Sequence, residues 1–249
     1  MRQKFFLSVE GNIGAGKSTF LHKIRDSLAC SLLWEPCHEW QDIEGLNLLD
    51  EFYKDIKRWA YSFQLYAFLT RIEAIEKKLK DKTWPEAFFI AERSIFADRY
   101  VFAQVCYEIG NMKQLEWNMY RKWFDWTLSR KEKKLFPAGL IYLKVDPEIS
   151  YQRIKFRGRS EEKDIPFDYL NLLNDCHNRW LIEKKELHSE IQDIPVLVLD
   201  CNEEFENDEK VWNNMLDKLI KFIKINYNDV LLPGECYGNS TSCKYSFKQ

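Results

Sequence analysis

Five short apolar runs recur along the chain, and segments long enough to form helices separate them. The runs cover residues 4–9, 31–35, 87–93, 139–145 and 196–199. Strands that alternate with helices favour a parallel sheet with helices on both of its faces. We therefore predict an α/β fold built on a five-stranded parallel sheet. Ligands of such sheets bind beyond the carboxyl ends of the strands, so those ends are the places to look for chemistry.

The intervening segments have helical periodicity. Residues 54–80 predict one long helix, whose buried face carries apolar side chains at three- and four-residue steps: Trp59, Phe63, Tyr66 and Leu69. Residues 98–130 are helical and rich in aromatic side chains, and we interpret them as a helix pair. An exposed apolar patch of that size is unfavourable, so we expect the pair to contact the sheet and a second subunit. The pattern over residues 208–226 predicts a last helix, which completes the domain.

Residues 11–19 read GNIGAGKST and stand directly between the first strand and the first helix. In this context the pattern GxxxxGK[ST] indicates a phosphate-binding loop. Its backbone N–H groups and the following helix N-terminus form an anion site, the lysine reaches the β- and γ-phosphates, and the serine hydroxyl suits Mg²⁺. Motors, switches and small-molecule kinases all use this loop. The predicted donor-binding residues are Gly11, Asn12, Ile13, Gly14, Ala15, Gly16, Lys17, Ser18 and Thr19.

Composition narrows the class of protein. The 249 residues suffice for one α/β domain, which we assign to 1–230, with a polar tail over 231–249 that we expect to be disordered. A net charge of −2 gives no reason to expect nucleic acid binding, and the chain has no apolar run of membrane-spanning length. The first strand starts at once, which leaves no room for a signal or transit peptide. Seven scattered cysteines indicate reduced thiols in the cytoplasm or nucleus.

Charged residues stand at the carboxyl ends of two predicted strands. Glu35 ends the second strand, where a carboxylate can accept a proton from a substrate hydroxyl; alternatively it is a surface residue in a turn. Glu92 and Arg93 end the third strand. They are either a structural ion pair or catalytic electrostatics, with the arginine beside a transferring phosphoryl group and the carboxylate near Mg²⁺.

Two further segments carry candidate binding groups. Gln64 and Arg71 share a stripe of the 54–80 helix, where they either hydrogen-bond a base edge or form a solvated flank. Residues 149–159 hold several cations and end at Gly158, which suits either an arginine-rich lid over the triphosphate or a solvated basic patch. The loop after the last strand is a candidate flank for the donor base.

Several motifs in order resemble one family, the deoxynucleoside kinases of the deoxycytidine/deoxyguanosine kinase type. They are SVEGNIGAGKSTF, the WEP turn, RWAYSFQLYAFLTRI, ERSIFADRYVF, RIKFRGRSEE and DCNEEF, and the resemblance covers roughly residues 4 to 225. It implies a P-loop kinase fold with an arginine-rich lid. It also implies a homodimer without membrane or nucleic acid partners.

The resemblance also implies roles for individual residues. Glu35 is the general base, assisted by Lys17 and Arg93, and Mg²⁺ lies near Ser18 and Glu92. The implied donor site adds the lid arginines and one loop: Arg153, Arg157, Arg159, Glu204 and Phe205. The implied acceptor site consists of Glu35, Trp40, Phe52, Tyr53, Phe63, Gln64, Ala67, Arg71, Arg93, Asp98, Phe102 and Glu162.

The function implied is ATP- and Mg²⁺-dependent phosphorylation of the 5′-hydroxyl of deoxynucleosides. Arg71 and Asp98 together favour deoxycytidine and purine deoxynucleosides over thymidine, because they crowd the position of a thymine methyl. Phe52 departs from the family pattern, where we expect a smaller residue, and its ring narrows the pocket. Two alternatives are a non-catalytic assembly subunit of the same fold and a nucleoside monophosphate kinase.

Overall fold

The computed structural model describes residues 5–28, 30–81, 88–130 and 134–227. Its five strands form one parallel sheet in the order β2-β3-β1-β4-β5. The predicted five-stranded parallel sheet is therefore confirmed, with boundaries that differ by one or two residues. The strands are β1 (Phe5–Glu10), β2 (Ser31–Leu33), β3 (Phe88–Glu92), β4 (Gly139–Lys144) and β5 (Val196–Asp200).

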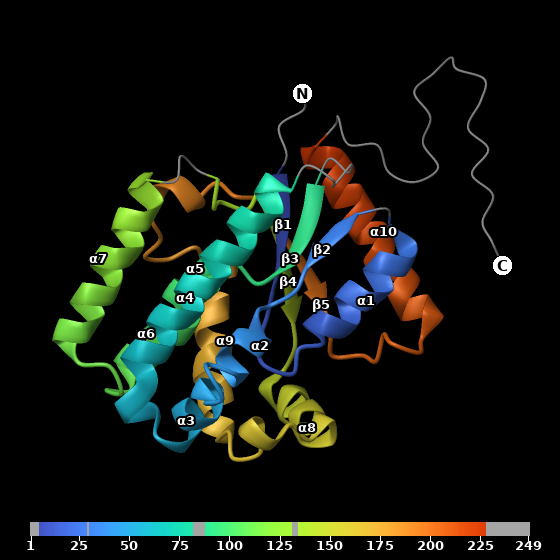
Figure 1. The fold of residues 1–249 in the computed structure, drawn as a ribbon. Helices are drawn as coiled ribbons and strands as arrows, with labels where there is room; N and C mark the ends of the chain where they lie inside the picture. The colour runs from blue at the N-terminus through green and yellow to red at the C-terminus, as the bar shows by residue number, and fades with distance from the viewer. Residues whose placement is uncertain (1–4, 29, 82–87, 131–133, 228–249) are drawn as a thin grey trace, which may run out of the picture.

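Helices cover both faces of the sheet, and each face has its own apolar core (Figure 1). On one face lie α1 (Lys17–Ser27) and α10 (Glu209–Asn226). The other face is covered by the larger group, which consists of α4 (Ile56–Lys80), α5 (Ile95–Ala97), α6 (Ala103–Glu108), α7 (Gln114–Arg130) and α9 (Phe167–Leu181).

Short helices gather below the carboxyl ends of the strands (Figure 1). They are α2 (Cys37–Gln41), α3 (Leu48–Lys54) and α8 (Pro147–Arg157). Helix α8 ends where predicted, because Gly158 adopts a left-handed conformation with φ of 67° and its N–H closes the last turn on the Ile154 carbonyl oxygen. Two 3₁₀ turns, Ser160–Glu162 and Ser189–Ile191, complete the connections.

The register of β1 against its neighbouring strands determines which residues come together at the carboxyl end of the sheet. Val9 pairs with Glu92, the last residue of β3, so the carboxyl ends of β1 and β3 lie at nearly the same level, whereas β4 pairs with Val9 through Ile141 and continues to Lys144. The chain that leaves β1 as the glycine-rich loop therefore runs beside the residues that follow β3. Upstream in the same strands, the rings of Phe6 and Phe89 stack with centroids 5.1 Å apart, which fixes this register in the core.

The predicted buried face of α4 is wrong in part. Phe63 is buried, but Trp59 and Tyr66 are only half-buried and Leu69 is 48% exposed. The buried face instead includes two polar residues, Gln64 and Arg71, so the solvated-flank alternative for them is also wrong. Counting apolar positions selected the wrong stripe because this helix directs polar side chains inward, toward a cavity.

Residues 98–130 do form a helix pair, but its first helix starts as a π-helix, η1 (Asp98–Phe102). Gly110, with φ of 75°, separates α6 from α7. The Met112 N–H donates to the Cys106 carbonyl oxygen at 2.8 Å and closes the turn. The predicted tail over 231–249, and the first residues of two predicted strands, lie outside the described residues. No described helix combines the length and the apolar character needed to cross a membrane.

Candidate active site

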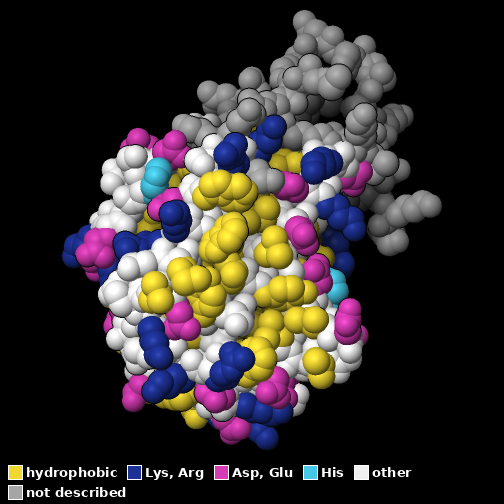
Figure 2. Space-filling view, turned by 60° about the vertical axis from the view of Figure 1, so that its left-hand side comes forward, with side chains coloured by type: hydrophobic (Ala, Val, Ile, Leu, Met, Phe, Trp, Pro, Cys, Tyr) yellow, Lys and Arg dark blue, Asp and Glu magenta, His cyan; other side chains and the backbone are white. Residues whose placement is uncertain are grey.

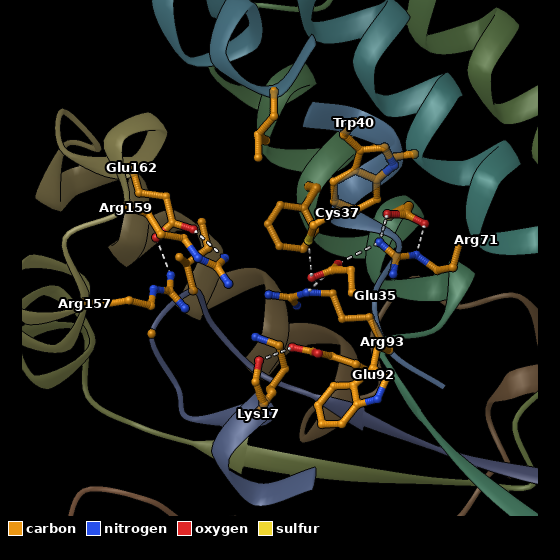
Figure 3. Close-up of a pocket in the computed structure, with 18 of the residues that line it drawn as sticks. Lys17, Glu35, Cys37, Trp40, Arg71, Glu92, Arg93, Arg157, Arg159 and Glu162 are labelled. Carbon is orange, nitrogen blue, oxygen red and sulfur yellow. Dashed lines mark hydrogen bonds and ion pairs between the residues drawn. The ribbon is translucent and has the colours of Figure 1, made fainter. Parts of the chain in front are cut away.

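A cavity of about 450 Å³ opens beyond the carboxyl ends of β1, β2 and β3. Its walls come from the glycine-rich loop and α1, from the ends of β2 and β3, from α3, α4 and η1, and from the end of α8 (Figure 3). Residues that are far apart in the sequence therefore face one space. The cavity has a phosphate-loop end and an aromatic end, with a cluster of charges between them.

The glycine-rich loop has the backbone conformation that its sequence predicts. Gly14 and Gly16 both have positive φ, at 77° and 88°. A Cβ atom on Gly14 would lie 2.5 Å from the carbonyl oxygen of Ser150, so only glycine fits against α8 there. The Lys17 ammonium donates to the Asn12 carbonyl oxygen at 2.9 Å. Burial, and next the charge of Arg93, lower the pKa of Lys17 to about 7.

Ser18 and Glu92 are brought together at the start of α1. The Ser18 hydroxyl donates to Oε1 of Glu92 over 3.0 Å, although the residues are 74 positions apart in the chain. A hydroxyl and a carboxylate beside a phosphate loop are the hard oxygen ligands that Mg²⁺ prefers, together with phosphate oxygens and water. The residues present therefore fit a magnesium ion that accompanies a triphosphate.

Glu35 occupies the centre of the charge cluster. Its Oε1 accepts from Nη2 of Arg71 at 2.9 Å and lies 3.3 Å from Nε of Arg93. Burial alone would raise the pKa of this carboxyl, but Arg71 and Arg93 outweigh it and lower the pKa to about 2. The Cys37 thiol donates to the other oxygen, Oε2, at 3.7 Å. Glu35 is consequently an ionised carboxylate with a fixed orientation.

Arg93 reaches this position through an unusual backbone conformation. Its φ of 65° is in the left-handed region, which costs a residue with a side chain about 1–3 kcal/mol. Two hydrogen bonds hold the turn, since the Arg93 N–H donates to the Val9 carbonyl oxygen and the Ser94 N–H donates to the Glu10 carboxylate. The guanidinium then donates to the Gly11 carbonyl oxygen at 2.8 Å. Arg93 thereby links Glu35 to the phosphate loop.

Arg71 and Asp98 form a buried, bidentate ion pair. Nε of Arg71 donates to Oδ2 of Asp98 at 2.8 Å, and Nη2 donates to Oδ1 at 3.1 Å. Because the same Nη2 also contacts Glu35, one arginine connects the end of β2 to the π-helix η1 (Figure 3). Fork-like geometry of this kind fixes direction as well as charge.

The aromatic end of the cavity is lined by rings that pack on one another. The rings of Phe52 and Phe63 stack with centroids 4.4 Å apart, and Trp40 meets Phe63 edge-on at 5.5 Å. Gln64 faces this space, and neither polar atom of its buried amide reaches a hydrogen-bond partner among the described residues. The amide lies close to Cys106 and lowers the pKa of that thiol, against the larger effect of burial, which raises it. An amide left unsatisfied beside stacked rings is a group prepared for the polar edge of a planar ligand.

The basic end of α8 closes the cavity from below. Arg157 and Arg159 both donate to the carboxylate of Glu162, and all three line the cavity (Figure 3). Tyr53 of α3 lies nearby, and its pKa is raised by burial and then by the charge of Glu162. The position of Tyr53 beside Glu162 places a hydroxyl and a carboxylate between the aromatic end and the phosphate loop.

Comparison with known proteins identifies the family. The family model described as deoxynucleoside kinase matches residues 7–224. The chain is 38% identical over 221 residues to a probable deoxycytidine kinase of fowlpox virus, with 87% of each chain covered. It is 37% identical over 239 residues to deoxycytidine kinase 2 of Gallus gallus, covering 87% of this chain and 89% of the relative. The mitochondrial deoxyguanosine kinase of Xenopus laevis is 34% identical over 235 residues, again with 87% and 89% covered.

The chain belongs to the deoxynucleoside kinase family. It is therefore a phosphotransferase that acts on deoxynucleosides, as the motifs implied. The cavity agrees with two substrates in one space, because the phosphate loop and the aromatic residues line the same cavity together with Glu35 and Arg93.

The structure brings most of the predicted site residues of this kinase to the cavity. All twelve predicted acceptor-site residues line it, as do Lys17, Ser18, Glu92 and two of the three lid arginines. Six predicted donor-site residues do not line it: Gly11, Asn12 and Ala15 of the phosphate loop, and Arg153, Glu204 and Phe205 outside it. Arg153 donates to the Glu203 carbonyl oxygen, Glu204 accepts from the backbone N–H groups of its own loop, and the buried Phe205 ring packs under Gly16.

Four cavity residues were not predicted: His22, Trp34, Cys37 and Leu49. Trp34 and His22 stack at 4.5 Å on the rim, and Cys37 contacts Glu35. Cys37 was within reach of sequence reasoning, since it lies two residues beyond Glu35. The Trp34–His22 contact joins β2 to α1 and has no local signal.

Proposed function

We propose that this kinase transfers the γ-phosphoryl group of ATP to the 5′-hydroxyl of deoxynucleosides, with deoxycytidine and purine deoxynucleosides preferred to thymidine. The observation that carries the proposal is the position of Glu35. It is an ionised carboxylate held by two arginines at the junction of the phosphate loop and the aromatic cavity. The base of the acceptor nucleoside lies against Phe63 and Gln64, and the 5′-hydroxyl of its sugar then points toward Glu35.

Each charged residue has a separate task in this mechanism. Glu35 accepts the hydroxyl proton, while Arg93 and Lys17 stabilise the charge that develops on the transferring group. The pKa of Glu35, at about 2, keeps it ionised, so it orients the hydroxyl in the ground state and takes the proton late in the transfer. When bound, Mg²⁺ neutralises charge on the donor phosphates, and Ser18 and Glu92 are the residues that would hold it.

The lid is part of the same proposal. Glu162 accepts from Arg157 and Arg159, so the two guanidiniums are aimed into the cavity from the turn after α8. We assign them to the donor phosphates, and Tyr53 with Glu162 to the sugar 3′-hydroxyl. Arg153 has its own partner outside the cavity, and we give it no direct contact with the donor.

The arrangement disfavours a nucleoside monophosphate as acceptor. An acceptor phosphate requires free cations, whereas Arg71 is already paired with both Asp98 and Glu35. The acceptor end otherwise offers an amide and aromatic rings, which suit a neutral nucleoside. A non-catalytic role has no support either, because every residue of the proposed chemistry lines one cavity.

We also propose a homodimer, formed through α4 and α7. These helices carry exposed apolar side chains that spread over one face of the molecule (Figure 2). A patch of this kind marks an interface. The exposed side chains are Leu69 on α4 and Leu115, Met119, Trp123 and Trp126 on α7.

The cellular compartment is proposed on different grounds. Four described cysteines, Cys37, Cys106, Cys176 and Cys201, are free thiols, which suits the reducing cytoplasm or nucleus. Imaging of the tagged full-length chain tests this, and localisation to an oxidising compartment would contradict it.

The function is tested by one phosphorylation assay with the full-length chain, ATP and Mg²⁺, in which the four deoxynucleosides and deoxycytidine monophosphate are compared. We expect product with deoxycytidine and the purine deoxynucleosides, and a lower kcat/KM with thymidine. A preference for the monophosphate, or no ATP consumption with any acceptor, would overturn the proposal. Omission of Mg²⁺ in a parallel series tests the metal requirement.

A further inference from the structure

A second cavity, of about 330 Å³, lies outside the active site between η1, α6, α7 and α9. It is at the lower end of the range of small-molecule sites. Four cations line it together with aromatic side chains. The cations are Arg99, Arg121, Arg179 and Lys185, and the aromatic residues are Tyr100, Tyr107, Trp117 and Trp180.

Two of these cations have no carboxylate partner among the described residues. Arg99 donates from Nη1 to the Gln104 side-chain oxygen at 3.2 Å, and Arg121 donates from Nη2 to the Asn118 side-chain oxygen at 2.9 Å. A guanidinium has five N–H donors in a fixed fork, so each retains donors that no described residue accepts. Burial lowers the pKa of Arg99, and the like charge of Arg121 lowers it further.

The same indole ring holds both guanidiniums in place. Arg99 stacks over Trp117 at 4.4 Å and Arg121 lies 5.8 Å from the same ring. The ring attracts a cation through its face without accepting the in-plane N–H bonds. Two guanidiniums beside one ring, each with only one N–H group engaged by a described residue, therefore form a clamp for an anion.

No described carboxylate forms an ion pair with either guanidinium of the clamp, although the charge of Asp125 acts on Arg99. Glu108 is bonded to Arg179 at 2.6 Å, and Lys185 is paired with Glu183 at 2.7 Å. Glu186 also lines the cavity but lies exposed at its edge. Arg99 and Arg121 are thus the two lining cations that stand outside any ion pair with a described carboxylate. A tetrahedral oxyanion matches paired guanidinium forks best.

We propose that the cavity between α6, α7 and α9 is a second ligand site, which binds the phosphate group of a small phosphorylated compound through Arg99 and Arg121. The site is separate from the phosphate loop. The π-helix η1 lines both cavities, because it places Asp98 and Phe102 in the active-site cavity and Arg99 in this one.

The test follows the Arg99 Nε–H and Trp117 indole N–H signals by nuclear magnetic resonance during titration of the full-length ¹⁵N-labelled chain. Inorganic phosphate, ribose 5-phosphate and uncharged ribose are the three probes. We expect saturable shifts with both phosphates and none with ribose. Tighter binding of ribose 5-phosphate assigns the site to phosphate monoesters, and equal binding assigns it to the phosphate group alone. Phosphate in the active site is distinguished by shifts of the Gly14 and Gly16 amides.

Three variants make the test specific. Arg121→Gln removes an exposed cation of the clamp and should weaken binding about tenfold or more, the value of one charged hydrogen bond. Arg99→Lys retains the charge but loses the fork, and should weaken binding similarly. Arg130→Gln, at the end of the same helix, is the matched control and should leave binding unchanged. Absence of saturable shifts, or equal weakening by Arg130→Gln, would overturn the proposal.

Discussion

Arg71 donates to Glu35 at 2.9 Å while the same guanidinium holds Asp98 in a bidentate ion pair. The carboxylate at the end of β2 is therefore fixed by a residue of α4, and that residue is fixed in turn by the π-helix η1. The proposed base-recognition pair and the proposed proton acceptor are thus joined in one hydrogen-bonded chain. The predictions below test its parts.

Glu35→Gln should lower kcat by roughly 10²–10⁴, the usual contribution of general base catalysis. The amide keeps the shape of the side chain but cannot accept the proton. A coupled ATP assay with deoxycytidine measures the loss, and thermal unfolding of the same sample separates it from misfolding. Glu39→Gln, four residues away on α2, is the control and should retain activity. Wild-type turnover in Glu35→Gln would refute the assignment.

Binding of the triphosphate should weaken as the pH rises above about 7. The lowered pKa of Lys17 means that its ammonium loses its proton through this range in the free enzyme. Only the charged form attracts phosphate, so the affinity should fall by up to about tenfold per pH unit. Titration of a non-hydrolysable ATP analogue between about pH 7.5 and 9 measures this. Lys17→Arg stays charged, and its affinity should not vary; a flat wild-type profile would contradict the prediction.

The double variant Arg71→Leu/Asp98→Ala removes the buried ion pair as a unit. It should raise the kcat/KM for thymidine relative to that for deoxycytidine by roughly 10- to 200-fold. The pair crowds the position of the thymine methyl and presents polar groups to the base edge. Arg71→Leu alone should instead destabilise the fold by about 3–5 kcal/mol, because it leaves the Asp98 carboxylate buried and unpaired. The proposed specificity is wrong if the double variant keeps the wild-type ratio.

Phe52→Leu should shift preference toward purine deoxynucleosides by roughly tenfold in relative kcat/KM. The change removes a ring that stacks on Phe63 and so widens the aromatic end of the cavity. It should cost about 1–2 kcal/mol of unfolding free energy. Phe222→Leu is the matched control, because Phe222 is a buried residue of α10 in the core on the other face of the sheet. It should lose comparable stability without any change in base preference, and an equal shift in both variants would argue against a role for Phe52.

Trp123→Glu should convert the proposed dimer to monomers, weakening association by at least about 30-fold, since a buried interface tryptophan contributes about 2 kcal/mol or more. Sedimentation velocity at several concentrations measures this. Phe156→Glu is the control, because Phe156 is the most exposed of the large apolar side chains and lies on α8, away from this face. A monomeric wild-type chain would rule out the dimer.

Local sequence signals predicted the strands and the phosphate loop well. Glycine residues in a turn between a strand and a helix permit positive φ, so the sequence itself predicted the conformation of Gly14 and Gly16. Glu35, Glu92 and Arg93 were found because they end strands, and a parallel sheet brings all such ends to one edge. The motifs that resemble the family then implied the remaining acceptor-site residues.

The interior of α4 was not predictable in the same way. Periodicity counts apolar positions, and by that count Leu69 belongs inside and Gln64 outside. The structure reverses both, because Arg71 is compensated by Asp98, 27 residues away, and by Glu35, 36 residues away. Burial of a polar side chain depends on partners from other elements, and one stripe of a helix does not record them.

The sequence by itself determined the sheet, the phosphate loop and the residues at the strand ends, because each follows from interactions within a few positions along the chain. Only the tertiary structure decided the surroundings of Glu35, the left-handed turn at Arg93 that brings its guanidinium to the Gly11 carbonyl oxygen, and the approach of Arg99 and Arg121 to one indole ring. Charges are neutralised, and pKa values shifted, by groups that are close in space. In this kinase those groups come from strands and helices that meet only after the chain has folded.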